Sequence, residues 1–225
     1  LEQVIEIAHQ RGVPVIVDAA AELPPVRNLR HFSDLGADLV IFSGGKDIAG
    51  PQSSGLILGR RDLICACGLN ANPRYSIGRP MKAGKEEIVG LIAALDCYLA
   101  QDRQAEHARW EDQIAHVIDT VGALSCVRAW RAYPWGSGVR PATIPRAYVA
   151  WDTDAVGLTA ERAIRALRSG EPAIAVGRAA TGAAAVARLG ASWEALFCNP
   201  QTLAPGEERI VARRIRELLV AHREA

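Results

Sequence analysis

Two charged residues near the start of the chain follow predicted strands. Asp18 ends the apolar run Val13–Val17, and Lys46 follows a second apolar run at 37–42. Side chains at the carboxyl ends of neighbouring parallel strands face the crevice in which α/β sheets bind ligands. Gly44 and Gly45 precede the lysine and lack a Cβ, so the backbone can approach a flat ligand closely. The spacing therefore predicts one site that contains a carboxylate and an amine.

Pyridoxal 5′-phosphate (PLP) chemistry requires a lysine amine, a carboxylate beside the pyridine nitrogen and donors to the phosphate. Lys46 and Asp18 supply the first two types of group, and the hydroxyl of Ser43 is a candidate phosphate donor. Each residue also has an ordinary interpretation, because aspartate often caps a turn and lysine in a glycine-rich loop is usually solvated. A Walker phosphate loop is excluded, since its spacing and the Ser or Thr after the lysine are absent.

The elements around these residues alternate between helix and strand. A helical stripe begins at Leu1, Val13–Val17 is a predicted strand, and a helix is expected near Leu29–Leu35. Further strands are predicted at 37–42 and at Ser54–Leu58. This alternation is typical of an α/β sheet with mainly parallel strands.

The second part of the chain predicts a smaller α+β domain. A loop is expected at Asn70–Pro80, and Ile88, Leu91, Ile92, Leu95 and Tyr98 predict one buried face of a helix that starts near Gly84. We expect the domain boundary inside the long helical region, giving domains at 1–101 and 102–225. The elements predicted after it are a helix through Trp110–Val121, strands at Val127–Ala132, Ala147–Trp151 and Ile174–Val176, and helices at Leu158–Arg168 and Pro205–His222.

Several motifs together resemble fold-type I PLP enzymes, and most closely the selenocysteine synthase-like family. That family includes L-seryl-tRNA(Sec) selenium transferase and D-glucosaminate-6-phosphate ammonia-lyases. The resemblance is strong from residue 1 to about 100, is weak around 130–200, and rests on Val17-Asp18-Ala19-Ala20, Phe42-Ser43-Gly44-Gly45-Lys46, Gly50-Pro51-Gln52-Ser53-Ser54-Gly55, Ile77–Lys82, Gly84–Ile88 and Leu203–Glu208.

The resemblance implies a role for each candidate site residue. Lys46 would hold PLP as a Schiff base, Asp18 would pair with the pyridinium nitrogen, and Ser43 would bind the phosphate. Gln52 lies in the same motif and is a candidate cofactor contact, with a structural turn as the alternative. Arg79 and Lys82 are candidates for binding a substrate carboxylate or phosphate, with a solvated loop as the alternative.

Two features depart from the family pattern. The family carries a long segment before its Asp-ended strand, whereas this sequence starts with Leu1 inside a helical stripe. We therefore expect residues 1–101 to be the C-terminal half of a PLP-binding large domain. In addition, Gly45 stands where class V aminotransferases commonly carry His, which argues against a cysteine desulfurase or an ordinary transaminase.

Composition limits the remaining classes of function. The net charge of +1 gives no global attraction to nucleic acid or to anionic membranes, and no apolar run is long enough for a membrane helix. Five scattered cysteines predict free thiols of a cytoplasmic protein and no metal site.

We expect a lyase- or transferase-type enzyme that catalyses α,β-elimination or β-replacement on an amino acid or amino sugar acid. A homo-oligomer, a dimer or larger, is implied by the resemblance. The alternatives are a truncated non-catalytic fragment, half of a split enzyme, or a tRNA-dependent selenium transferase. The last is not favoured, because the arginines of the final helix alternate with glutamates.

Overall fold

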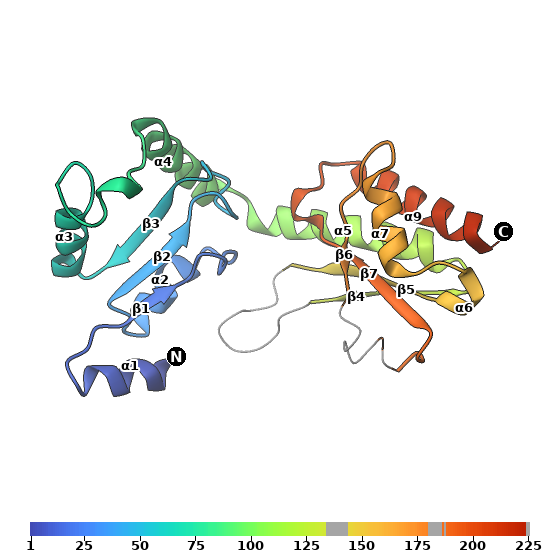
Figure 1. The fold of residues 1–225 in the computed structure, drawn as a ribbon, viewed down its shortest axis with the longest axis horizontal. Helices are drawn as coiled ribbons and strands as arrows, with labels where there is room; N and C mark the ends of the chain where they lie inside the picture. Colours follow the sequence, from blue (N-terminus) through green and yellow to red (C-terminus); the bar gives the residue numbers. More distant parts are fainter. Residues whose placement is uncertain (134–143, 180–185, 187, 224–225) are drawn as a thin grey trace. The chain divides into compact units, whose positions relative to one another are not determined.

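A computed structural model describes residues 1–133, 144–179, 186 and 188–223. The chain divides into two compact units, Leu1–Gln101 and Asp102–Ala225 (Figure 1). Each unit has its own hydrophobic core, so the residues that form one core come from one contiguous stretch of sequence.

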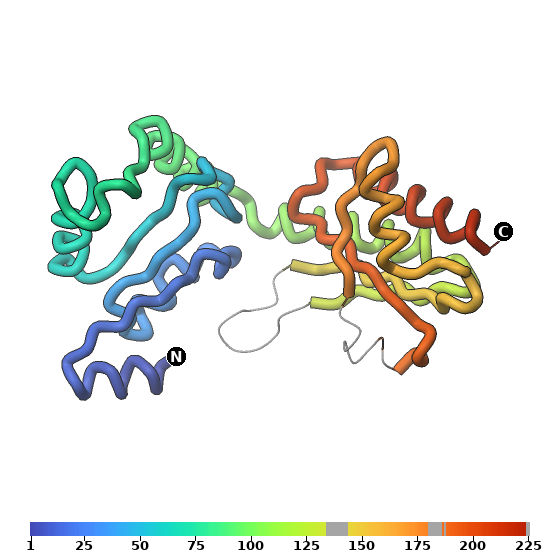
Figure 2. Tube along the Cα trace, viewed as in Figure 1, coloured from blue at the N-terminus to red at the C-terminus, as the bar shows by residue number. Residues whose placement is uncertain are grey.

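The first unit is built around a three-stranded sheet in the order β1-β2-β3. The strands are β1 (Ile16–Asp18), β2 (Leu39–Ser43) and β3 (Gly55–Gly59), with β1 and β2 parallel and β2 and β3 antiparallel. The helical segments are α1 (Glu2–His9), α2 (Asn28–Asp34), α3 (Arg61–Asn70), the 3₁₀ turn η1 (Arg79–Met81) and α4 (Lys85–Ala100). The chain passes from β1 through α2 to β2, so the carboxyl ends of β1 and β2 meet at one edge (Figure 2).

Helices cover one face of this sheet. Val40 and Phe42 of β2 are fully buried and belong to the same core as Phe32 of α2 and Leu91 and Tyr98 of α4. Successive side chains of a strand point to opposite faces, so these residues fix which face is covered. The alternate residues of β2, such as Ile41, therefore lie on the other face.

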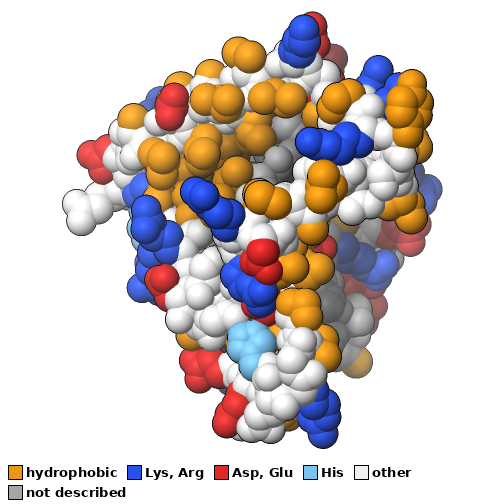
Figure 3. Space-filling model, turned by 90° about the vertical axis from the view of Figure 1, so that its left-hand side faces the viewer, with side chains coloured by type: hydrophobic (Ala, Val, Ile, Leu, Met, Phe, Trp, Pro, Cys, Tyr) orange, Lys and Arg blue, Asp and Glu red, His pale blue; other side chains and the backbone are white. Residues whose placement is uncertain are grey.

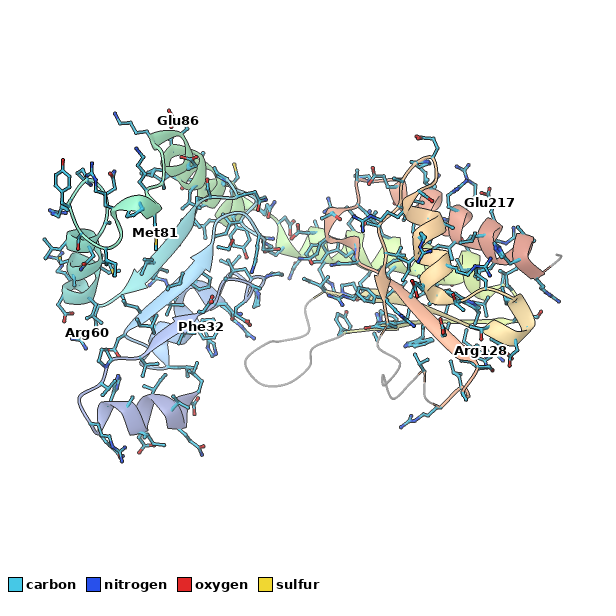
Figure 4. All side chains as sticks on the ribbon, viewed as in Figure 1. Phe32, Arg60, Met81, Glu86, Arg128 and Glu217 are labelled. Carbon is cyan, nitrogen blue, oxygen red and sulfur yellow. The ribbon has the colours of Figure 1, made fainter. Side chains whose placement is uncertain are left out.

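Asp38 joins three segments at the opposite end of the strands from Lys46. Its carboxylate accepts hydrogen bonds from Nη1 of Arg60 (2.8 Å) and the backbone N–H of Val15 (2.7 Å), and lies 2.8 Å from Nε2 of His9. The side chain is 4% exposed. Arg60, labelled in Figure 4, immediately follows β3. Hydrogen bonds from His9, Val15 and Arg60 hold the pKa of Asp38 well below its usual range, although burial opposes the shift.

Replacing Asp38 with alanine should lower the free energy of unfolding by roughly 3 kcal/mol, because three donors lose their buried acceptor. A carboxyl with a depressed pKa stabilises the fold above the pKa of the unfolded state, about 3.9, and loses this contribution as pH falls toward the folded pKa. Urea unfolding should therefore show a steeper loss of stability below about pH 4 in the wild type than in Asp38→Ala. The exposed Asp34→Ala variant is the matched control, and equal stability of the two variants would contradict this account.

The second unit contains a four-stranded antiparallel sheet in the order β4-β5-β7-β6. Its strands are β4 (Val127–Ala132), β5 (Arg146–Asp152), β6 (Gly177–Arg178) and β7 (Trp193–Cys198), and its helices are α5 (Arg103–Gly122), α6 (Thr153–Val156), α7 (Ala160–Arg168) and α9 (Glu207–Arg223), with the 3₁₀ turn η2 (Pro200–Thr202). Its core is formed by the sheet together with α5, α7 and α9. Trp151 is fully buried at the centre and donates from Nε1 to the carbonyl of Leu158 at 2.7 Å.

Most predicted elements form, with differences at three places. Residues 61–70, which follow the third predicted strand, form α3, and the strand predicted at Ile174–Val176 forms instead at Gly177–Arg178. On α4, Leu91 and Tyr98 are buried as predicted, whereas Ile88 and Ile92 are 50% and 58% exposed. This helix is apolar around most of its circumference, so sequence periodicity could not identify its buried side.

No helix within the described residues has the length and hydropathy needed to cross a membrane. All five cysteines are free thiols.

Candidate functional site

Asp18 and Ser43 lie on the same face of the first unit's sheet. Asp18 is paired with Ile41 in the parallel register of β1 and β2, and Ser43 is two residues beyond Ile41. Paired residues on adjacent strands point to the same side, as do residues two apart on one strand. This is the face that the helices of the first unit leave open, and its residues Ile16 and Ile57 are 60% and 42% exposed.

Other apolar side chains of the first unit are also exposed. Figure 3 shows one face of the molecule, on which hydrophobic side chains gather next to lysine and arginine side chains. The most exposed large apolar side chains belong to Tyr75, Ile77 and Met81 in the segment before α4. This segment is the one in which Arg79 and Lys82 lie.

The carboxylate of Asp18 is oriented by its own turn. Its Oδ1 accepts the backbone N–H of Ala20 at 3.0 Å, and the residue is exposed. No hydrogen bond to Oδ2 is found within the described part of the chain. The hydrogen bond to Oδ1 therefore orients the carboxylate, and Oδ2 is available to accept a hydrogen bond from a ligand.

Lys46 lies in a tight turn directly after β2. Its carbonyl accepts the N–H of Ala49 at 2.8 Å, and the carbonyl of Gly44 accepts the N–H of Gly50 at 2.8 Å. The N–H of Gly44 in turn donates to the carbonyl of Ser54 at 3.0 Å. The lysine side chain is exposed. The turn thus presents an accessible amine on a backbone that is hydrogen-bonded at both ends.

Both glycines before the lysine are required by close packing. A Cβ on Gly44 would collide with Oγ of Ser54, and a Cβ on Gly45 would lie 2.6 Å from Oε1 of Gln52. Close approach of a ligand to these glycines stays a prediction. In the structure the glycines allow the chain on the far side of the turn to pack against them.

Ala49 adopts a left-handed backbone conformation, with φ of +58°. This conformation costs an L-residue about 1–2 kcal/mol. Strained residues are concentrated at functional sites, and this one lies three positions after the candidate lysine. No feature of the sequence pattern predicted it.

Replacement of Ala49 with glycine should raise the free energy of unfolding by about 0.5–1 kcal/mol. Glycine adopts this φ without steric cost, and the larger entropy of the unfolded chain offsets part of the gain. Ala93→Gly, at an exposed position inside α4, is the matched control and should lower it by about 1 kcal/mol. Chemical denaturation of both variants checks this, and a loss of stability in Ala49→Gly would show that the backbone is not strained there.

Gln52 contacts the lysine turn. Its Nε2 donates to the carbonyl of Gly45 at 3.1 Å. Ser53, the next residue, donates from Oγ to Oε1 of Glu87 on α4 at 3.3 Å. Contact of Gln52 with a cofactor stays a prediction, and its contact with the backbone beside Lys46 is an addition that the sequence did not indicate.

Arg79 and Lys82 line an open cavity of about 460 Å³. The guanidinium of Arg79 lies 4.3 Å from the centre of the Tyr75 ring and donates to the carbonyl of Pro73, so its position is fixed within the loop. Lys82 is exposed. The remaining lining residues are Asn72, Tyr75, Ser76 and Pro80. Two cations beside two hydroxyls and an amide suit an anionic ligand, and this use of the cavity stays a prediction.

The first unit therefore carries an amine, a carboxylate and a hydroxyl at one edge of its sheet. A lysine amine can attack a carbonyl carbon and, when neutral, can accept a proton. A carboxylate can hold a proton on a ring nitrogen, and a serine hydroxyl can donate to a phosphate oxygen. Within the described residues, no group of three or more His, Cys, Asp or Glu side chains has an arrangement that could hold a metal ion.

Comparison with known proteins gives a consistent result. Residues 1–118 match the family described as SelA: L-seryl-tRNA selenium transferase. The chain is 37% identical to a 5′-C-glycyluridine monooxygenase-decarboxylase from Streptomyces sp, over 99% of this chain and 50% of that protein. It is 32% identical to D-glucosaminate-6-phosphate ammonia lyase from Salmonella typhimurium, over 97% of this chain and 52% of that protein.

Solved structures of similar fold were also found. A structure of D-glucosaminate-6-phosphate ammonia-lyase matches with a TM-score of 0.73 and 30% identity, over 98% of this chain and 53% of that one. The cysteine desulfurase CsdA from Escherichia coli matches with a TM-score of 0.53 and 18% identity, over 98% and 55% of the two chains, which is a likeness of fold alone. The chain spans about half the length of the curated relatives it matches.

Proposed function

Because the chain belongs to the L-seryl-tRNA selenium transferase family, we propose that it is part of a PLP-dependent enzyme in which Lys46 anchors the cofactor. The observation that supports this most directly is the position of Lys46. It lies in the turn after β2, at the edge where the parallel strand β1 ends with Asp18. Residues 1–101 are then the part of the large domain that holds the lysine, and residues 102–225 form the small domain.

The chemistry of the donor set fits this cofactor. The exposed amine of Lys46 can form a Schiff base with an aldehyde. Oδ2 of Asp18 can accept a hydrogen bond from a protonated ring nitrogen. The hydroxyl of Ser43 lies on the same sheet face as Asp18, where it can contribute one donor to the phosphate. A phosphate dianion usually takes several donors, so Ser43 would be one of a larger set.

Bound PLP supplies an electron sink that stabilises negative charge at Cα of an amino substrate. The residues of this chain then have distinct tasks. Asp18 keeps a proton at the pyridine nitrogen through Oδ2, while Ala20 holds Oδ1. When not bonded to the cofactor, Nζ of Lys46 would be the base that takes the proton from Cα of the substrate. Its backbone lies in a hydrogen-bonded turn, which limits movement of the residue that carries this amine.

The reaction class proposed is α,β-elimination or β-replacement on an amino acid or amino sugar acid. Removal of the Cα proton places charge next to a β-substituent, which can then leave with its electron pair. D-Glucosaminate-6-phosphate ammonia lyase is a relative whose name describes loss of ammonia. The relative from Streptomyces is named a monooxygenase-decarboxylase, so loss of CO₂ from Cα is the competing outcome to be measured.

A small molecule is favoured over tRNA as the substrate. Three arginines of α9 lie close to glutamates, with N–O distances of 3.8 Å for Arg213–Glu217 and Arg214–Glu217 and 3.7 Å for Arg209–Glu208. A helix face with paired charges offers little net attraction to phosphate groups. We also propose that Arg79 and Lys82 bind an anionic group of the substrate. The protein is proposed to form a homo-oligomer.

The proposed reaction can be tested with β-chloroalanine, a small amino acid with a good leaving group at Cβ. Purified protein loaded with PLP should release chloride and pyruvate, and the Cα position should exchange with deuterium in D₂O. Carbon dioxide release without chloride release would favour decarboxylation. Absence of both deuterium exchange and product, in protein shown to contain PLP, would contradict the proposed reaction class.

A further inference from the structure

We propose that Gln52 is a positioning residue that fixes the orientation of Lys46 through the carbonyl of Gly45. This inference rests on the proposed function for the role of Lys46, and on the structure for the contact. Nε2 of Gln52 donates to Gly45 O at 3.1 Å, across a gap of seven residues. The carbonyl of Gly45 belongs to the peptide whose nitrogen is that of Lys46, so the hydrogen bond restrains the plane from which the lysine side chain extends.

The main chain at Gln52 is itself held in place. Ser54, two residues later, donates its N–H to the carbonyl of Pro51 at 3.1 Å and its Oγ to the same oxygen at 2.6 Å. Pro51 packs against Gly90 of α4, where an added Cβ would lie 2.8 Å from Cγ of the proline. Gln52 therefore reaches the lysine turn from a segment anchored on both sides.

Gln52 lies against Gly45, although the residue is exposed to solvent. A Cβ on Gly45 would lie 2.6 Å from Oε1, 2.7 Å from Cα and 2.8 Å from Cδ of Gln52, so the glutamine side chain lies directly against Gly45. Any other residue at position 45 would displace it. The glycine before the lysine and the glutamine after it act as one unit, which gives a physical reason for both residues in the motif.

The contact matters because of the side of Lys46 on which it acts. The hydrogen bond from Ala49 N–H to Lys46 O closes the turn on one side, through a residue in a left-handed conformation. The Gln52 amide restrains the opposite, N-terminal side of Lys46. A lysine that must alternate between holding the cofactor and removing a proton gains from a fixed Cα position, since small misplacements reduce rates strongly.

The test compares Gln52→Met, which keeps the length but removes the donor, with Gln52→Glu, which faces Gly45 O with a carboxylate. Gln3→Met, an exposed position in α1, is the matched control. We expect the N–H of Ala49 to exchange with deuterium about three- to tenfold faster in Gln52→Met, and faster still in Gln52→Glu, as measured without cofactor. The rate constant for covalent attachment of PLP, followed by visible absorbance, should fall by a similar factor, with an unchanged midpoint of thermal unfolding.

Wild-type exchange rates and wild-type attachment rates in both Gln52 variants would overturn the inference. A reduced attachment rate with a matching loss of global stability would also overturn it, because the residue would then be only structural. Failure of the wild type itself to attach PLP at Lys46 would instead contradict the proposed function. The exchange measurement needs no cofactor and would still decide whether Gln52 restrains the turn.

Discussion

Lys46→Ala should abolish both covalent attachment of PLP and turnover. The side chain is exposed in a turn at the carboxyl edge of the sheet, and its amine has two tasks, attachment of the cofactor and removal of the Cα proton. Loss of such a group commonly lowers rates by several orders of magnitude. The visible absorbance band of bound PLP should disappear, and the rate of product formation should fall below detection.

Because Lys46 is exposed, its replacement with alanine should leave the fold intact, and circular dichroism checks this. Lys85→Ala, at the exposed first residue of α4, is the matched control and should retain both properties. Retention of a borohydride-reducible adduct in Lys46→Ala would show that another lysine is the anchor. The chain has only two others, Lys82 and Lys85, so the alternative is limited.

Asp18→Asn should leave PLP bound but slow removal of the Cα proton by on the order of 100-fold or more. The asparagine Oδ1 can still accept the N–H of Ala20, so the turn after β1 is retained. What is lost is the negative charge that keeps a proton on the ring nitrogen. Deuterium exchange at Cα, measured by NMR in D₂O, isolates this step from product release.

A matched control for this variant is Asp34→Asn, an exposed aspartate in α2. It should behave like the wild type in both cofactor content and exchange rate. An Asp18→Asn protein with near wild-type exchange would contradict the role of Asp18. A variant that loses PLP entirely would indicate that Asp18 contributes mainly to binding.

The sequence predicted the site's framework because that framework depends on local patterns. Apolar runs at Val13–Val17 and at 37–42 identified two strands, and the helix between them implied that the strands are parallel. The register of β1 and β2 then places Asp18 and Ser43 on one sheet face. Family resemblance supplied the cofactor, which no single residue pattern specifies.

Other features depend on contacts between distant segments and were not predictable. The Asp38 cluster joins residues 22 to 29 positions apart in the sequence. Helix α3 was missed although Leu63, Ile64 and Cys67 are half-buried at helical spacing, because a short run that includes Gly68 gives a weak signal. The left-handed conformation of Ala49 was hidden, since alanine rarely adopts it.

The most direct test of the central claim is borohydride reduction of the PLP-loaded protein followed by peptide mapping. Reduction converts a reversible bond between cofactor and lysine into a stable one, which mass spectrometry can assign to a residue. The chain contains three lysines in two regions, so the assignment is unambiguous. We predict a single phosphopyridoxyl adduct on the peptide that contains Lys46. An adduct confined to Lys82 or Lys85, or no adduct on Lys46 in protein shown to contain bound PLP, would contradict the account.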